Sequence, residues 1–194
     1  MSLFGRVTCL GVLASLAAGC ATMTSARLSP QLTSIRNFQS VSRGIYRGAQ
    51  PNSQGLEDLK DLGIKTIVSL RIPPQVIEWE AAMADQLDMN FVSLPLSTYE
   101  RPSASEVREF LKIVTDPTRQ PVFVHCRQGQ MRTGAMIASY RVLHQGWTVE
   151  QAYAEAKQLG FHDRYPWYLP LKWFIWNLDD SSPLAIISPP PLLQ

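Results

Sequence analysis

The chain has 194 residues, of which 45% are hydrophobic and 18% are charged, and its formal net charge is +2 at pH 7. This length is sufficient for one domain with a substantial buried core. Because acidic and basic residues nearly balance, the composition argues against a nucleic-acid-binding surface, and we expect no nucleic-acid partner.

The N-terminus differs in composition from the rest of the chain. Arg6 precedes a short apolar run over residues 7–18, which is too short to span a bilayer and has the layout of a secretory signal. The small residues 17–19 stand directly before Cys20 and resemble the lipobox of bacterial lipoproteins. This resemblance implies that residues 1–19 are a signal peptide and that Cys20 is lipidated. Secretion without a lipid and a cytosolic location are the alternatives.

The residue after the lipidated cysteine bears on location. Ala21 stands there in place of an aspartate. By resemblance to lipoproteins of Gram-negative bacteria, this favours the periplasmic face of the outer membrane. The lipid on Cys20 is then the only expected link to the membrane.

Two further segments have biased compositions. Residues 20–36 are rich in Ser, Thr and Ala, which predicts a flexible tether. Residues 181–194 contain four prolines and no charged side chain, which predicts a loosely held tail. Residues 37–180 remain as the one folded domain.

The first part of this domain alternates between strand and helix patterns. Residues 38–46, interrupted by Gly44, predict two short strands. Ser53 suits the N-cap of a helix that Gly63 ends, and its core face holds Leu56, Leu59 and Leu62. The β-branched run over residues 64–70 predicts a buried strand.

The alternation continues through the middle of the chain. Pro73-Pro74 precedes a predicted helix over residues 77–87, and residues 91–96 predict another strand. Ser103 and Glu106 have the spacing of a capping box ahead of a helix whose apolar residues recur at helical spacing.

The last elements surround the most informative motif. Residues 122–124 predict a strand, residues 133–144 a helix, and Thr148 with Gln151 the capped start of another helix. Residues 170–178 close the domain. Strands that alternate with helices predict an α/β fold with a mostly parallel central sheet and helices on both faces. A functional site is then expected at the carboxyl end of the strand that leads to Cys126.

That motif reads His125-Cys126, five residues, then Arg132-Thr133. A strand brings the cysteine to a short loop, and a helix begins where the loop ends. Backbone N–H groups of such a loop, together with the positive helix end, form a cup for a tetrahedral dianion. The same field stabilises a thiolate, and Arg132 can grip two phosphate oxygens through its planar fork.

Cysteine usage is consistent with a nucleophilic role for Cys126. Cys9 leaves with the signal peptide and Cys20 carries the lipid, so Cys126 is the one free thiol expected in the mature chain.

His-Cys-x5-Arg-Thr resembles the signature of the cysteine-dependent phosphatases, both tyrosine-specific and dual-specificity. The segment Tyr46-Arg47-Gly48-Ala49-Gln50-Pro51, with the helix and strand after it, is similar to the small atypical dual-specificity phosphatases of plants, fungi and bacteria. The likeness spans residues 41–177. It implies a phosphatase-like three-layer sandwich, no cofactor, a phosphorylated protein or small molecule as substrate, and a monomer.

The resemblance also implies roles for the residues of the motif. Cys126 would form a phosphocysteine that water hydrolyses, while Arg132 and the loop amides stabilise charge on the phosphate oxygens. Thr133 would stabilise the sulfur as leaving group, and His125 would support the loop. The expected phosphate-binding residues, most of them forming the rim, are Arg127, Gln128, Gly129, Gln130, Met131 and Arg132.

The general acid is less evident. Relatives use an Asp after the strand at residues 91–96, whereas this chain has Glu100 in that loop as its candidate. Arg71 either reaches the pocket or pairs with a carboxylate. His162 and Asp163 fit surface positions better than catalytic ones, and no residues have metal-ligand spacing, so no metal is expected.

Three functions agree with these residues. The first is a protein-tyrosine or dual-specificity phosphatase at the cell envelope. The second keeps the chemistry but acts on an inositol phosphate, a lipid head group or another small molecule. The third is a phosphate-binding pseudophosphatase that recruits partners. Retention of both Cys126 and Arg132 favours an enzyme over the third.

Overall fold

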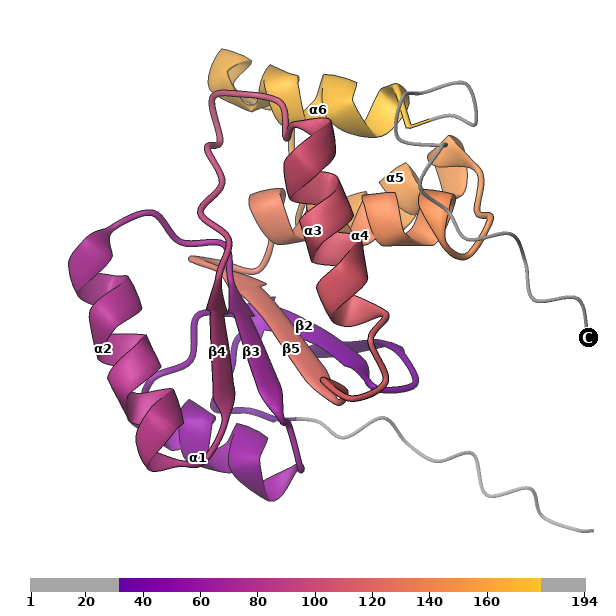
Figure 1. Ribbon diagram of the computed structural model, residues 1–194. Helices are drawn as coiled ribbons and strands as arrows, with labels where there is room; N and C mark the ends of the chain where they lie inside the picture. The colour runs from indigo at the N-terminus through magenta and orange to yellow at the C-terminus, as the bar shows by residue number, and fades with distance from the viewer. Residues whose placement is uncertain (1–31, 179–194) are drawn as a thin grey trace, which may run out of the picture.

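The computed structural model describes residues 32–178, which form a sheet of five strands with helices on both faces (Figure 1). The strand order is β1-β2-β5-β3-β4. β1 pairs antiparallel with β2, and the other three pairings are parallel, which confirms the predicted mostly parallel sheet. The strands are β1 (Gln39–Ser42), β2 (Ile45–Ala49), β3 (Thr66–Ser69), β4 (Asn90–Ser93) and β5 (Val122–Cys126).

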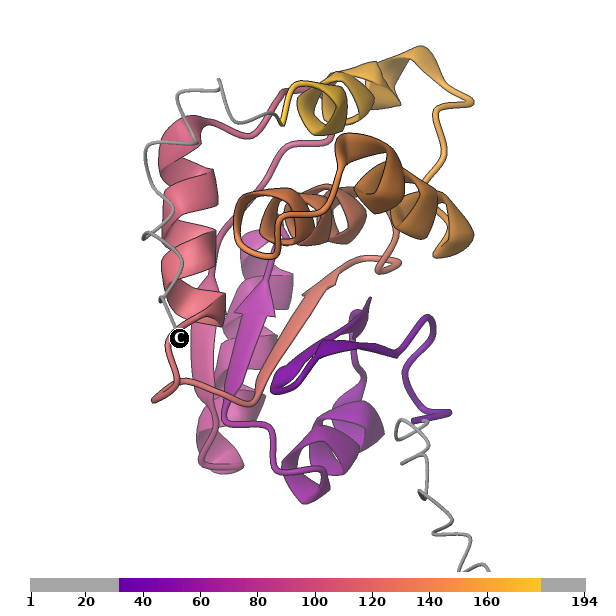
Figure 2. The same ribbon diagram turned by 90° about the vertical axis from the view of Figure 1, so that its right-hand side faces the viewer.

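The helices form two unequal layers. α1 (Ser53–Asp61) and α2 (Pro74–Gln86) cover one face of the sheet. α3 (Ala104–Val114) and α4 (Met131–Leu143) cover the other, and the remaining two helices pack on α4, farther from the strands (Figure 2). Those two are α5 (Val149–Gln158) and α6 (Leu169–Trp176), the latter preceded by a 3-10 turn, η1 (Pro166–Tyr168).

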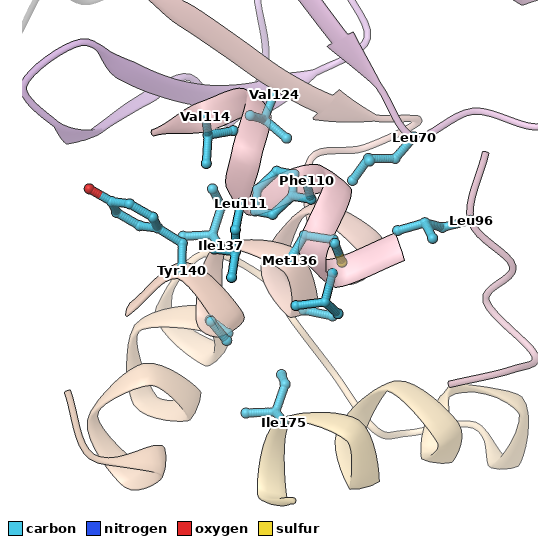
Figure 3. Packing of buried hydrophobic residues seen from close by; sticks show 14 of the residues in the cluster. Leu70, Leu96, Phe110, Leu111, Val114, Val124, Met136, Ile137, Tyr140 and Ile175 are labelled. Atoms are coloured by element: carbon cyan, nitrogen blue, oxygen red, sulfur yellow. The ribbon is translucent and has the colours of Figure 1, made fainter. Parts of the chain in front are cut away.

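The central strand β5 is buried on both faces. Its Phe123 belongs to the core under α1 and α2, whereas Val122 and Val124 belong to the larger core under α3 and α4. Figure 3 shows Val124 in this second core with Phe110 of α3 and Met136 of α4. Burial on both faces is typical of a central parallel strand, and it gives the end of β5 a rigid position.

Capping signals placed the starts of α3 and α5 correctly, whereas α2 begins at Pro74, three residues before the predicted helix, and α4 begins two residues before its predicted start. Both predicted capping boxes are present, at Ser103 and at Thr148. Gly63 has a φ of +84°, as the predicted end of the first helix requires. The predicted N-cap at Ser53 is wrong by one residue: the cap is Asn52, whose side-chain oxygen accepts from the Gly55 N–H at 2.8 Å.

The predicted boundary between tether and domain is wrong. Ile35 is only 2% exposed and packs in the core beneath α1, and the Ser34 hydroxyl donates to Asp58 of α1 at 2.5 Å. Packed structure therefore begins before residue 37, because Ile35 buries apolar surface that the tether composition did not reveal. The predicted signal peptide, Cys20 and the proline-rich tail lie outside the described residues.

Between residues 32 and 178, no helix has both the length and the apolar character needed to cross a membrane.

Candidate active site

The carboxyl end of β5 opens into the pocket that holds Cys126. The strand ends at this residue and α4 begins at Met131, so the intervening turn is short; residues 126–132 are called the cysteine loop below. Cys126 is 3% exposed and lies in a pocket of about 290 Å³. The other lining residues are Thr98, Tyr99, Arg127, Gln128, Met131, Arg132 and Tyr168. Five of the predicted site residues are thus brought together.

The Cys126 sulfur is stabilised as a thiolate. Burial acts to raise its pKa, but the hydroxyl and amide of Thr133, the charge of Arg132 and the amide of Gln128 outweigh that effect, and the pKa is lowered from its ordinary value. The Thr133 hydroxyl is buried and has no other hydrogen-bond partner in the described part of the chain. The thiolate is the form that acts as a nucleophile, and a lowered pKa increases the fraction of Cys126 in that form.

Arg132 is held by backbone carbonyls. Its Nη1 donates to the carbonyl oxygen of Leu70 at 2.9 Å and to that of Leu96 at 3.4 Å, just beyond the ends of β3 and β4. Its Nε is buried and has no partner among residues 32–178. The guanidinium is therefore positioned by the sheet while part of its fork stays available for a phosphate oxygen.

The Gly129 peptide is anchored on the side of the loop away from the pocket. Its carbonyl oxygen accepts from Arg47 Nη2 at 2.5 Å and from Asn37 Nδ2 at 2.9 Å. The C=O and N–H of a trans peptide point in opposite directions. Because the Gly129 carbonyl faces Arg47, the N–H of Gln130 is turned toward the cup.

Gly129 itself is required by this arrangement. Its φ is +67°, and a Cβ there would collide with the backbone carbonyl of Gly48 on β2. The cysteine loop therefore rests directly on the backbone of the neighbouring strand.

Arg47 adds a buried positive charge behind the loop. It is 1% exposed and forms no ion pair with a described carboxylate. Burial lowers the pKa of Arg47 to about 10, against the opposing effect of the Cys126 thiolate. Arg47 is thus still protonated at neutral pH, and its charge favours the ionised sulfur.

His125 points away from the pocket and is tied to α2. Both His125 and Glu80 are fully buried, and His125 Nε2 lies 2.8 Å from Glu80 Oε1. The imidazole stacks on Phe123, and the second Glu80 oxygen accepts from Ser69 and from Gln50, each at 3.4 Å. This placement agrees with the predicted supporting position.

Two of the predicted phosphate-binding residues, Gly129 and Gln130, are not among the residues that line the pocket. Gly129 presents its carbonyl to Arg47, as described above. Gln130 lines a separate polar pocket with Arg36 and Asn37, and its side chain lies against Gly160. The prediction that the Gln130 side chain lies on the rim is wrong, because successive residues of a tight turn point to different sides, while its N–H is still turned toward the cup.

The predicted general acid lies outside the pocket. Glu100 lines a neighbouring pocket, whereas Thr98 and Tyr99 of the same loop face Cys126. No aspartate or glutamate is among the described residues that line the catalytic pocket. Residues 32–178 therefore present no carboxylate there to protonate a leaving group.

Arg71 follows neither predicted alternative fully. Its Nη1 donates to the amide oxygen of Gln50 at 2.7 Å, so its partner is not a carboxylate. Burial lowers its pKa first, and the charges of Arg132 and Arg127 lower it further. Arg71 thus adds positive charge close to the cysteine loop.

His162 and Asp163 have structural contacts. Asp163 forms ion pairs with Lys157 of α5 and Lys172 of α6, and the His162 ring packs against Tyr168. Over the described residues, His, Cys, Asp and Glu side chains form no group of three or more that could hold a metal ion.

Sequence reasoning missed the residues behind the loop. Asn37 and Glu80 gave no signal, because their partners are distant in the sequence. Arg47 was noted only as part of a family-like segment. The available signal was an arginine within a strand pattern, since buried arginines are rare unless they have a specific partner.

The chain is similar to several known phosphatases. A family model described as "DSP-PTPase phosphatase fused to NAD+ Kinase" matches residues 30–164. The chain is 34% identical over 128 residues to the dual specificity protein phosphatase TpbA of Pseudomonas aeruginosa strain UCBPP-PA14. That match covers 66% of this chain and 56% of the relative, so the chain spans little more than half the length of that protein.

Two solved structures share the fold. The core catalytic domain of the PP-IP phosphatase SIW14 from S. cerevisiae has a TM-score of 0.66 at 25% identity, covering 78% of this chain and 90% of that one. A variant of P. aeruginosa TpbA in complex with pTyr has a TM-score of 0.65 at 27% identity, covering 80% of this chain and 93% of that one.

Proposed function

Because this chain belongs to the DSP-PTPase phosphatase family, we propose that it hydrolyses phosphate monoesters through a covalent phosphocysteine on Cys126. The proposal rests on the lowered pKa of the Cys126 thiol in a pocket that also holds Arg132. A pseudophosphatase would gain nothing from an activated nucleophile beside a phosphate-binding guanidinium.

The reaction has two steps. The Cys126 thiolate attacks phosphorus in line with the leaving oxygen, so an S–P bond forms as the P–O ester bond breaks. Arg132 Nε and the loop amides stabilise charge on the equatorial oxygens. Water then attacks phosphorus, the S–P bond breaks with its electron pair on sulfur, and inorganic phosphate leaves. The Thr133 hydroxyl stabilises the thiolate released in this second step.

Phosphotyrosine is the substrate group that the pocket fits best. A phenolate leaves with little protonation, which suits a pocket without a described carboxylate. Tyr99 and Tyr168 on the pocket wall provide aromatic surface for a phenyl ring. The related TpbA structure, in complex with pTyr, adds support.

A phosphoanhydride is the second candidate substrate. It also needs little leaving-group protonation, and SIW14 is named a PP-IP phosphatase. Arg127 at the pocket and Arg71 close to it supply positive charge that suits a second phosphate.

The deciding experiment is phosphate release by the purified protein from three substrates: a phosphotyrosine peptide, a phosphoserine peptide and an inositol phosphate that carries a diphosphate group. We expect the phosphotyrosine peptide to give the highest kcat/KM and the phosphoserine peptide the lowest. The highest value on the inositol substrate would establish the second candidate. If none of the three substrates released phosphate, the chain would be a phosphate-binding pseudophosphatase.

Location follows from the N-terminal sequence alone. We propose that lipid on Cys20 anchors a monomeric phosphatase domain at the cell envelope, since small residues precede that cysteine. Mass spectrometry of the membrane fraction tests this: an acylated Cys20 at the N-terminus is expected, and a soluble chain that keeps Met1 would contradict it. Sedimentation of the purified domain tests the monomer.

A further inference from the structure

A second pocket adjoins the one that holds Cys126. It has a volume of about 470 Å³ and lies between the loop after β4 and the segment formed by η1 and α6. It is called the aromatic pocket below, and its lining residues are Tyr99, Glu100, Arg101, Pro166, Leu169, Pro170 and Trp173. Apolar side chains supply most of this lining, whereas the catalytic pocket is lined mainly by the cysteine loop.

The two pockets are adjacent. Tyr99 lines both of them, and Tyr168 of the catalytic pocket is followed directly by Leu169 of the aromatic pocket. A molecule whose phosphate is bound at Cys126 therefore reaches the aromatic pocket by crossing Tyr99.

The aromatic pocket is open in the part of the chain that the structure describes. Tyr99 is 70% exposed and Trp173 is 53% exposed, values that are unusual for large aromatic side chains. Arg101 holds its guanidinium 5.4 Å above the Trp173 ring, which links the two walls. Grouped exposed aromatics beside a catalytic pocket are typical of a binding surface.

We propose that the aromatic pocket binds a large apolar side chain, such as leucine or phenylalanine, next to the phosphotyrosine of a peptide substrate. This inference rests on the proposed function and extends it from the phosphorylated group to its neighbours. Adjacency to the catalytic pocket selects the occupant, because a peptide can carry an apolar side chain a short distance from its phosphate. An inositol phosphate that carries a diphosphate group has no apolar side chain to place there.

The test compares two phosphotyrosine peptides that differ only in the residues flanking the phosphotyrosine, leucine in one and glycine in the other. Burial of one apolar side chain predicts a kcat/KM for the leucine peptide about tenfold higher. Trp173→Ala and, separately, Leu169→Ser should bring this ratio close to one. Trp176→Ala is the matched control, because Trp176 is also exposed on α6 but does not line the pocket.

p-Nitrophenyl phosphate distinguishes the proposed phosphatase activity from side-chain binding in the aromatic pocket, since it is too small to fill more than the catalytic pocket. Its turnover should be equal in the parent protein and all three variants, which also shows that they are folded. A ratio near one in the parent protein, or a ratio unchanged by Trp173→Ala and Leu169→Ser, would overturn the aromatic pocket and leave the proposed function intact. Failure of the parent protein to hydrolyse p-nitrophenyl phosphate would remove the proposed function, and the inference with it.

Discussion

The two sides of the cysteine loop differ in the contacts of their polar groups, although Arg47 on the back side also keeps its Nε and Nη1 buried without a described partner. On the cup side, the Arg132 Nε and the Thr133 hydroxyl are buried without an ordinary protein partner. On the back side, the Gly129 carbonyl accepts from two donors, and His125 lies against a buried carboxylate. Groups left open on the cup side are available to substrate and sulfur, while groups paired on the back side determine the loop's shape.

This difference leads to a general expectation. Substitutions on the cup side should reduce catalysis more than the free energy of unfolding, because the Arg132 Nε and the Thr133 hydroxyl have no other partner among the described residues. Substitutions on the back side should reduce both, because the same contacts hold the loop and connect it to β2 and α2.

The largest effect is expected from Cys126→Ser. Removal of the nucleophile should lower kcat on p-nitrophenyl phosphate by about 10⁴-fold or more. Phosphate binding and the free energy of unfolding should change little, since the two side chains are similar in size. Steady-state assays and urea unfolding measure both quantities. Turnover near that of the parent protein would mean that another group attacks phosphorus.

Arg132→Lys should have the second largest effect on kcat. A lysine keeps the charge but cannot reproduce the planar fork or the bond to the Leu70 carbonyl, so kcat should fall by about 10²- to 10³-fold. The free energy of unfolding is the control here. A loss of stability as severe as the loss of rate would place Arg132 with the back side instead.

Arg47→Met tests the back side directly. Loss of the bond to Gly129 should lower kcat/KM by about tenfold, as a displaced loop amide would. Because the Arg47 cation favours the thiolate, its removal should also raise the pKa of Cys126. The acidic limb of the pH–rate profile should then move to higher pH. Thiolate absorbance against pH measures that shift. Arg47→Lys, which retains the charge, should shift the profile less.

Glu80→Gln should affect stability more than rate. An amide nitrogen or oxygen in place of the carboxyl group disturbs the 2.8 Å contact with His125 Nε2, so the free energy of unfolding should fall by about 1–3 kcal/mol, while kcat falls only a few-fold. Chemical denaturation and the p-nitrophenyl phosphate assay give the two numbers. A rate loss comparable to that of Arg132→Lys would show that the carboxylate has a catalytic part.

Glu100→Gln should have the smallest effect. Because Glu100 lies outside the catalytic pocket, kcat should change less than about twofold on both p-nitrophenyl phosphate and a phosphoserine peptide. If hydrolysis of the phosphoserine peptide alone became slower, and the basic limb of its pH–rate profile became flatter, Glu100 would be restored as the general acid.

The parts of the fold and of the site that could be predicted from the sequence are those whose residues lie close together in the chain. The cup side could be predicted because Cys126, Arg132 and Thr133 lie within one loop and the start of its helix. Capping boxes are equally local, and both were predicted. The back side could not be predicted, because Arg47, Asn37 and Glu80 meet the loop only after the sheet has formed.

The prediction of strand length was inaccurate for a different reason. The predicted strand over residues 91–96 includes Leu94 and Leu96, which are buried, yet β4 ends at Ser93. An apolar pattern reports burial, and it does not distinguish a residue paired in a sheet from one that packs beneath a loop.

The close approach of Gly129 to Gly48 limits where this domain can be truncated. The segment from β3 to α6 contains the complete cysteine motif, but it lacks the strand on which the loop rests and the donors Asn37 and Arg47. A fragment of that kind would carry the nucleophile without its support. The smallest competent unit therefore begins ahead of Asn37, and a cysteine motif without such a preceding strand is insufficient evidence of a working phosphatase.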